Sequence, residues 1–253
     1  IMLAFVLKPY DNLSKGTTLE LEEVMRELES KASSSTKATY LRHGAVEPLF
    51  GVKVGDLKPI LKKVKGQQDL AIKLFATKNS DAMYLAGLIA DGSKMTKKQL
   101  DQWAAAATWH MIAGCSVAWV ATENPAGFEL ACKWIDSKKE LVAVAGWSTL
   151  SGVVATLPDS ELPIDDVKQL LDRCVKTIKT SPNRVRQSMN SFIISVGTYV
   201  APLADQAIKS ARKIGVVEVD VGDTQCKIPE AESYIIKSRR GANVAPKRKT
   251  MRC

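Results

Sequence analysis

Apolar residues recur at the spacing of a helix through most of this 253-residue chain. Residues three or four positions apart share one face of a helix, and Leu21, Val24, Met25 and Leu28 follow that spacing after an opening at Thr17 and Thr18. The pattern predicts further helices over residues 35–41, 57–64, 70–75, 83–89, 97–107, 109–121, 126–135, 141–154, 167–178, 184–200 and 204–214. Glycine and proline residues separate these segments, so about a dozen apolar stripes must be buried against one another.

The helices predict an all-α fold built from stacked helix pairs. A pair recurs about every 30 to 40 residues, which is the period of HEAT and armadillo units, and such pairs stack into a solenoid with a concave face. A compact helical bundle is the alternative. We expect an N-terminal segment over residues 1–16, the helical-repeat domain over 17–215 and a C-terminal extension over 216–253. The extension alternates like a strand over 217–221, and a short helix follows Pro229.

The motifs of several enzyme and membrane classes are missing. The longest apolar run, residues 1–7, is far shorter than the roughly 20 residues of a membrane-spanning helix and has no features of a signal peptide. There is no phosphate-binding loop, dinucleotide fingerprint, nucleophile elbow or zinc-protease helix. The two histidines, His43 and His110, are far apart, and the five cysteines form no C-x-x-C pair. We therefore expect a cytoplasmic protein without a metal or cofactor.

Basic residues are concentrated at the C-terminus. The net charge is +9, and the last 17 residues hold seven basic residues and no acidic one, so the rest of the chain has a net charge of only +2. A basic arm attracts polyanions, nucleic acid above all, although a solvated terminus is an equal alternative. The residues of this arm that we select as DNA contacts are Arg239, Arg240, Lys247, Arg248 and Lys249.

Two further patterns are consistent with nucleic-acid binding. All five tryptophans fall between residues 103 and 147, where they either fill the core or offer stacking faces. Basic residues gather at helix starts, where helix N-termini add to their attraction for phosphate. Repeated along one edge of a solenoid they would follow a duplex. The candidates are Lys53, Lys94, Lys97, Lys98, Lys179, Arg184 and Arg186.

Two stretches resemble a known family. Residues 49–58, which read LFGVKVGDLK, resemble the opening signature of the bacterial DNA alkylation repair family, the HEAT-like-repeat alkylpurine glycosylases. Lys133-Trp134-Ile135 followed by a helix pair is similar to the family as well. The resemblance extends over residues 20–215, and the C-terminal extension is similar to that of some longer members.

The resemblance implies duplex DNA held in a concave basic cleft by a bacterial cytosolic or nucleoid protein, which we expect to be a monomer. Family glycosylases remove purines alkylated at N3 or N7, using a carboxylate near the sugar and aromatic faces beside the cationic base. The family pattern has a Trp, an Asp four residues later, an Arg in the next repeat and a later Trp. In this sequence the Asp position becomes Ala113 when Trp109 is the Trp, whereas a gap-free register puts Ala105 and Trp109 at the Trp and Asp positions. The Arg position becomes Val144, and the later Trp falls near Ser191 or Phe192.

Three functions follow from these departures. The first is a DNA-binding member of the family with little or no glycosylase activity. The second is an active glycosylase with a relocated acid, for which the register of Trp119 with Glu123 supplies a carboxylate. In both, Trp109, Trp119 and Phe192 are the expected lesion contacts. The third is a HEAT-repeat scaffold that binds other proteins.

Overall fold

A computed structural model describes residues 19–252, which form thirteen α-helices and no strand. The α-helices are α1 (Leu21–Glu29), α2 (Ser34–Arg42), α3 (Leu57–Val64), α4 (Gln68–Ala76), α5 (Ser80–Ile89), α6 (Lys97–Ala106), α7 (Ala118–Thr122), α8 (Gly127–Trp134), α9 (Glu140–Thr156), α10 (Ile164–Thr177), α11 (Asn183–Tyr199), α12 (Ala204–Ile214) and α13 (Ala231–Arg239). A π-helix, η3 (Ile112–Val117), runs directly into α7. None of the helices in this part of the chain is long and apolar enough to cross a membrane.

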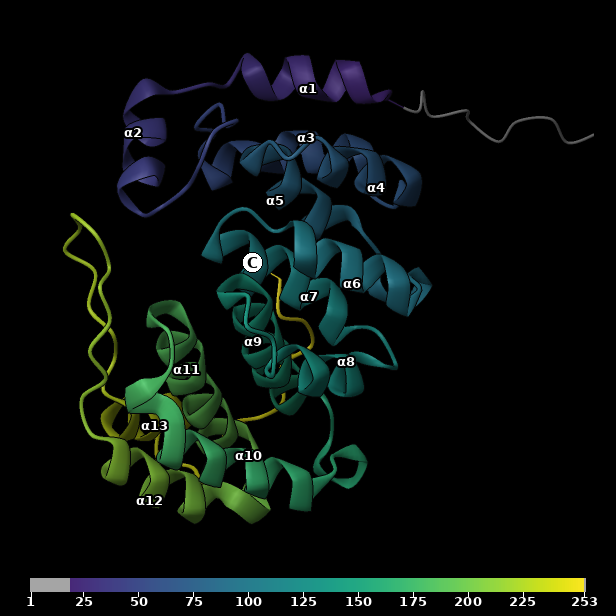
Figure 1. The fold of residues 1–253 in the computed structure, drawn as a ribbon. Coiled ribbons are helices and arrows are strands. Elements are labelled where there is room, and N and C mark those ends of the chain that lie inside the picture. Colours follow the sequence, from purple (N-terminus) through teal and green to yellow (C-terminus); the bar gives the residue numbers. More distant parts are fainter. Residues whose placement is uncertain (1–18, 253) are drawn as a thin grey trace, which may run out of the picture.

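The sequence places the helices correctly, including the short one after Pro229. The N-terminal segment over residues 1–16 and the predicted cap at Thr17-Thr18 lie outside the described residues. The first helix begins instead at Leu21, where the Glu23 carboxylate accepts the Glu20 backbone N–H at 3.0 Å. The helices stack from α1 at one end to α12 at the other, and α2 and α13 project to the same side of the stack (Figure 1). This is the helical-repeat solenoid that the element period predicts.

Four helical segments run side by side through the middle of the stack, and we call them the central row: α5, η3 with α7, α9, and α11. Small residues let these segments approach closely. A Cβ atom added to Gly87 of α5 would lie 2.5 Å from the Cα of Ser116 in η3. One added to Gly152 of α9 would lie 2.2 Å from the hydroxyl of Thr122 at the end of α7. Most residues of α5 and α9 are buried, as expected for helices that are apolar all round.

The segments of the central row run parallel to one another. At the starts of α9 and α11, the Glu140 carboxylate accepts the Arg184 backbone N–H at 2.6 Å. Just beyond their ends, the Asp159 carboxylate accepts the Ala201 backbone N–H at 3.0 Å. The other neighbours run the same way. Thr108 before η3 donates to the sulfur of Met83 in α5, and Glu123 after α7 accepts from Gly92 after α5. Gly114 faces Ser148 and Thr122 faces Gly152, in the same order along η3–α7 and α9. The four starts therefore lie along one edge of the row, the N-terminal edge, and the four ends lie along the opposite C-terminal edge.

The tryptophans fill the spaces between helices. The Trp103 ring stacks on Phe75 with centroids 3.8 Å apart, and the Trp147 ring lies 5.3 Å from Phe192. All five tryptophans are buried. Of the two alternatives that the sequence leaves open, core filling is therefore the one that the structure adopts.

The LFGV stretch that carries the family resemblance is bound by a single buried carboxylate. Asp81, in the first turn of α5, accepts the backbone N–H groups of Phe50, Gly51 and Val52 at 2.6, 3.0 and 2.9 Å. Gly51 has a φ of +81°, and a Cβ there would lie 2.5 Å from the Lys37 backbone nitrogen. Only glycine fits this position, because other residues would be strained and would collide with α2.

The second resembling stretch is also explained by an aspartate. Asp101 of α6 forms an ion pair with Lys133 at 2.8 Å and accepts the indole N–H of Trp134 at 2.7 Å. These bonds join α6 to α8, the corresponding helix of the next pair. Both stretches therefore fasten neighbouring helices together.

The predicted strand over residues 217–221 is wrong, because this segment is irregular and has no partner strand in the described chain. The Asn183 side chain instead pairs with the backbone of Asp220, donating to its C=O and accepting its N–H, both at 2.7 Å. At Gly222, where φ is +74°, a Cβ would lie 2.6 Å from the Arg42 carbonyl oxygen. Residues 216–228 therefore extend from the end of α12 to α2 at the far end of the stack (Figure 1).

Replacing Asp81 should lower the free energy of unfolding sharply. Asp81→Asn removes the charge that three backbone N–H groups share, and we expect a loss of about 3 kcal/mol. Asp69→Asn, an exposed aspartate in α4, is the matched control and should change stability by less than about 0.5 kcal/mol. Urea denaturation measures both. Equal losses for the two variants would contradict the anchoring role of Asp81.

Candidate nucleic-acid interface

Three side chains from distant parts of the sequence come together at the N-terminal edge. Arg184 lies in the first turn of α11, His110 lies at the start of the segment that contains η3, and His43 follows α2. Burial, together with the nearby charges of Arg184 and His43, lowers the pKa of His110 from 6.5 to about 4. His110 is therefore neutral at pH 7, and the positive charge at this place belongs to Arg184.

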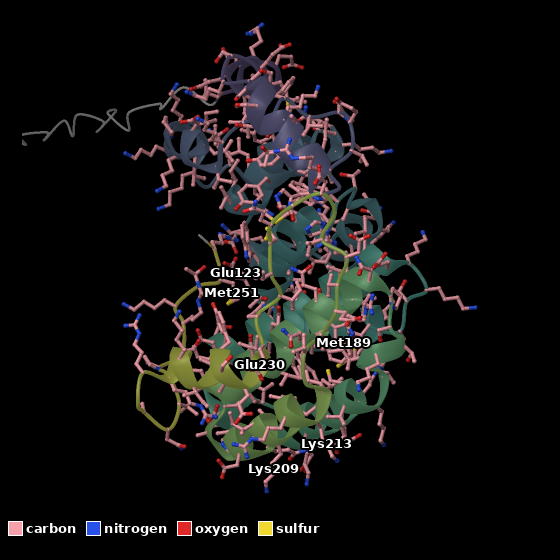
Figure 2. The ribbon with its side chains drawn as sticks, turned by 90° about the vertical axis from the view of Figure 1, so that its left-hand side faces the viewer. Glu123, Met189, Lys209, Lys213, Glu230 and Met251 are labelled. Atoms are coloured by element: carbon pink, nitrogen blue, oxygen red, sulfur yellow. The ribbon has the colours of Figure 1, made fainter. Side chains whose placement is uncertain are left out.

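The segment of residues 216–228, which we call the strap, crosses the same side of the molecule. Its tip, Asp223, Thr224 and Gln225, lines an open depression of about 400 Å³ together with Arg42 and His43. In Figure 2 the strap passes in front of the central row on its way from α12 to the upper part of the molecule. The N-terminal edge is thus covered in part by a segment that is attached at both of its ends.

A second depression lies at the base of the strap. It has a volume of about 310 Å³, and its charged lining residues are Lys179, Arg186 and Glu218. The other lining side chains are aliphatic, with Ile178 and Ile214 among them. The structure therefore brings together Lys179 and Arg186 as the sequence predicts, and adds a carboxylate from the strap that the sequence analysis did not place.

The sequence analysis missed two lysines on this edge. Lys138 and Lys139 are exposed and directly precede Glu140, the first residue of α9. Paired lysines at a helix start are the pattern by which Lys97 and Lys98 were chosen as DNA contacts, so the sequence carried the same indication for Lys138 and Lys139. With these lysines, the starts of α9 and α11 both carry basic side chains.

The central row adds its own field to these charges. The N–H groups in the first turn of a helix have no partners within the helix and carry a partial positive charge. Because the four segments are parallel, these charges lie along one edge. An edge of this kind, with arginines and lysines beside it, is suited to phosphate oxygens.

Other predicted DNA contacts lie elsewhere, so the expectation that they share one edge is wrong. Lys94 follows the end of α5 on the C-terminal edge, where it pairs with Asp91 at 3.1 Å. Lys97 begins the outer helix α6, where it pairs with Glu129 at 2.5 Å, and Lys98 is exposed beside it. Lys53 is exposed directly before the short 3-10 helix η1 (Val54–Asp56).

Some basic residues of the C-terminal tail contact the protein itself, and others are exposed. The Arg239 guanidinium donates to the carbonyl oxygens of Gly197 and Ala204 at 2.8 and 3.1 Å. Lys247 pairs with Asp159 at 2.8 Å. The side chains of Arg240, Arg248 and Lys249 are exposed. The tail is therefore neither a free arm nor a frayed terminus.

The candidate catalytic acid Glu123 lies on the C-terminal edge. Its carboxylate pairs with Arg252 at 2.5 Å and accepts the Gly92 backbone N–H at 3.4 Å. Trp119, its aromatic partner in the predicted register, is buried in the helical segment that Glu123 follows. The Glu123 carboxylate therefore has a structural partner and no open aromatic face from Trp119.

The aromatic lesion contacts also differ from the expectation. Phe192 is fully buried and Trp119 is 5% exposed, so neither offers a face to a ligand. Trp109 is 6% exposed, and its indole N–H donates to the His43 carbonyl oxygen at 2.8 Å. Ala113 and Val144, where the resemblance leads us to expect the family Asp and Arg, are buried in the central row. Within residues 19–252 no cluster of His, Cys, Asp and Glu could hold a metal ion.

Comparisons with known proteins find a family model and two similar proteins that cover most of the chain. The model of a family described as DNA alkylation repair enzyme matches residues 24–235. The chain is 33% identical to an uncharacterized protein of Listeria innocua over 231 residues, which are 89% of this chain and all of that protein. It is 34% identical to an uncharacterized protein of Listeria monocytogenes over 227 residues, 87% of this chain and 98% of that one.

A solved structure is similar over most of the chain. The TM-score is 0.84 at 36% sequence identity, and the match covers 93% of this chain and all of the other. That structure is described as "a new family of proteins related to the HEAT-like repeat DNA glycosylases with affinity for branched DNA structures".

The low pKa of His110 predicts a pH dependence of stability. Between about pH 6.5 and pH 4 the unfolded chain binds a proton at His110 that the folded chain excludes, so stability falls as the pH falls through this window. The melting temperature of the wild type should therefore decline more steeply over this window than that of His110→Asn. Thermal melts at a series of pH values test this. Identical slopes for the two proteins would contradict it.

Proposed function

Because this chain belongs to the DNA alkylation repair family, we propose that it binds DNA along the N-terminal edge of the central row, prefers branched DNA, and has little or no glycosylase activity. The observation that carries the proposal is the meeting of Lys179, Arg186 and the strap at the start of α11, where Arg184 lies in the same first turn. Phosphates bind there to the basic side chains, and the dipoles of the parallel helices add to the attraction.

The strap is the argument for branched DNA. It runs along the same side as the basic residues and is anchored by Asn183 at α11 and against Arg42 at α2. A straight duplex laid along this edge would collide with the strap along the whole length of the strap. The arms of a branched molecule diverge and can pass on either side of it. The similar solved structure is of a family with affinity for branched DNA, which supports the same preference.

The chemistry of the edge argues against base removal. Cleavage of a glycosidic bond needs a carboxylate placed near the developing positive charge on the sugar. The family position for it is Ala113, and Glu123 is paired with Arg252 on the opposite edge. Loss of such a group typically costs a factor of about 10³ in rate. Binding can persist without it, because phosphate contacts provide most of the affinity.

Two arginines at the N-terminal edge should account for measurable DNA affinity. Arg184→Ala with Arg186→Ala removes two cations from the proposed phosphate sites, so the slope of log affinity against log salt should decrease by about 2. The matched control is Lys209→Ala with Lys213→Ala, two exposed lysines of α12 at the foot of the molecule (Figure 2). Fluorescence anisotropy with a four-way junction and a duplex of equal length measures both pairs.

In that experiment the wild type should bind the junction more tightly than the duplex, and the control pair should keep the wild-type slope. An unchanged slope in the Arg184/Arg186 variant would remove the N-terminal edge from the interface. Failure to bind either DNA would favour the protein scaffold.

Base release tests the enzymatic alternative directly. DNA that carries 7-methylguanine should lose no more base with the protein than with buffer, because Ala113 stands at the expected carboxylate position and Glu123 is paired with Arg252. Glu123→Gln should give the same result. Release by the wild type that disappears in Glu123→Gln would establish the relocated acid and overturn this part of the proposal.

A further inference from the structure

The C-terminal tail, residues 239–252, contacts the helices of the central row in reverse order. It begins at α11, where Arg239 donates to the Gly197 carbonyl oxygen and the Ala245 backbone N–H donates to the Thr198 carbonyl oxygen, both at 2.8 Å. It then reaches α9 and ends beside α7 and α5. One tail therefore touches every member of the row.

Its contacts with α9 use both a side chain and the backbone. The Lys247 ammonium donates to the Val154 carbonyl oxygen at 2.8 Å and pairs with Asp159 just beyond the helix. The Arg248 backbone N–H donates to the Ala155 carbonyl oxygen at 2.8 Å. Both acceptors belong to the last turn of α9, whose carbonyl groups have no partners within the helix.

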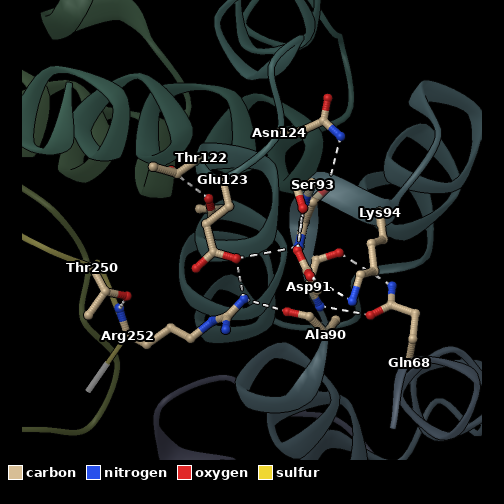
Figure 3. Close-up of polar contacts among 12 residues, drawn as sticks. Gln68, Ala90, Asp91, Ser93, Lys94, Thr122, Glu123, Asn124, Thr250 and Arg252 are labelled. Carbon is tan, nitrogen blue, oxygen red and sulfur yellow. Dashed lines mark hydrogen bonds and ion pairs between the residues drawn. The ribbon is translucent and has the colours of Figure 1, made fainter. Parts of the chain in front are cut away.

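The end of the tail bridges the C-terminal ends of α5 and α7. The Arg252 guanidinium donates to the Ala90 carbonyl oxygen, directly after α5, and to the Glu123 carboxylate, directly after α7 (Figure 3). Glu123 in turn accepts the Gly92 backbone N–H. Met251 packs against the core next to this group, and Figure 2 places it beside Glu123. Arg252 is thus held by two helix ends at once.

The electrostatics of the row explain why the tail is basic. Four parallel helices bring their partial negative charges together at the C-terminal edge. Carbonyl groups of α5, α9 and α11 at this edge accept from Arg252, Lys247 and Arg239. Cations at helix C-termini are stabilising, and buried carbonyl groups need donors.

We propose that residues 239–252 form a latch that fixes the spacing and curvature of the central row, and that the Arg252–Glu123 pair is its end point. In a solenoid each repeat contacts only its neighbours, so relative movement of repeats accumulates along the stack. The latch opposes this, because it bonds to residues 93, 129 and 162 positions earlier in the chain. The inference does not depend on the proposed function, since it concerns the edge opposite the DNA site.

Four variants and one double variant test the latch. Truncation after Gly241 removes the contacts with Ala90, Glu123 and α9. Arg252→Ala and Glu123→Gln each break only the end point. Lys249→Ala is the control, because it removes the same charge from an exposed position of the same tail. Hydrogen exchange without DNA and thermal melts are the measurements.

Truncation should lower the melting temperature by about 5 °C and raise amide exchange at least tenfold at the ends of α5 and α9. Arg252→Ala should raise exchange at the ends of α5 and α7 only, and it tests the latch even if the truncated chain does not fold. Glu123→Gln combined with Arg252→Ala should lower the melting temperature little more than Arg252→Ala alone, because the two residues act as one pair. Lys249→Ala should leave both readouts unchanged.

Unchanged exchange at the end of α5 in Arg252→Ala would overturn the proposal, as would an equal effect of Lys249→Ala. Junction binding distinguishes a latch from a DNA-binding arm. A latch keeps the salt slope in Arg252→Ala, whereas an arm that contacts phosphate loses about 0.9.

Discussion

The parallel arrangement of four central helices determines how charge is distributed over this molecule. Each helix carries a partial positive charge at its start and a partial negative charge at its end, and parallel packing places like ends side by side. The row therefore has one edge suited to anions and one edge that requires cations. Arg184 and Arg186 lie on the first edge, and the C-terminal tail covers the second. The proposed DNA site and the proposed latch both follow from this parallel packing.

The two stretches that identify the family turn out to be anchors of the fold. Asp81 holds LFGV by three backbone N–H groups, and Asp101 holds Lys133 and Trp134. Both anchors serve the stacking of the helices. Membership in the family is therefore informative about architecture rather than about activity.

Periodicity was sufficient to predict the helices, because a buried stripe at helical spacing is a local property of the sequence. The site was harder to predict, because composition does not specify what a charged or aromatic side chain contacts. Seven basic residues near the C-terminus look the same whether their partner is a phosphate or a helix carbonyl, and Lys247 and Arg252 bind carbonyls. Glu123 has the right chemistry for a catalytic acid, but it forms an ion pair with Arg252, which lies 129 residues later in the sequence. The alternation over 217–221 gives no strand, because a strand needs a neighbouring strand to pair with, and only the tertiary fold decides whether one is present.

A footprint of bound DNA by hydrogen exchange tests the division of the two edges most directly. With a four-way junction bound, the account predicts slower exchange at the starts of η3 and α11 and in residues 220–225. It predicts no change at the ends of α5 and α9 or in residues 245–252. Protection confined to the tail and the C-terminal edge, with none at the start of α11, would contradict it.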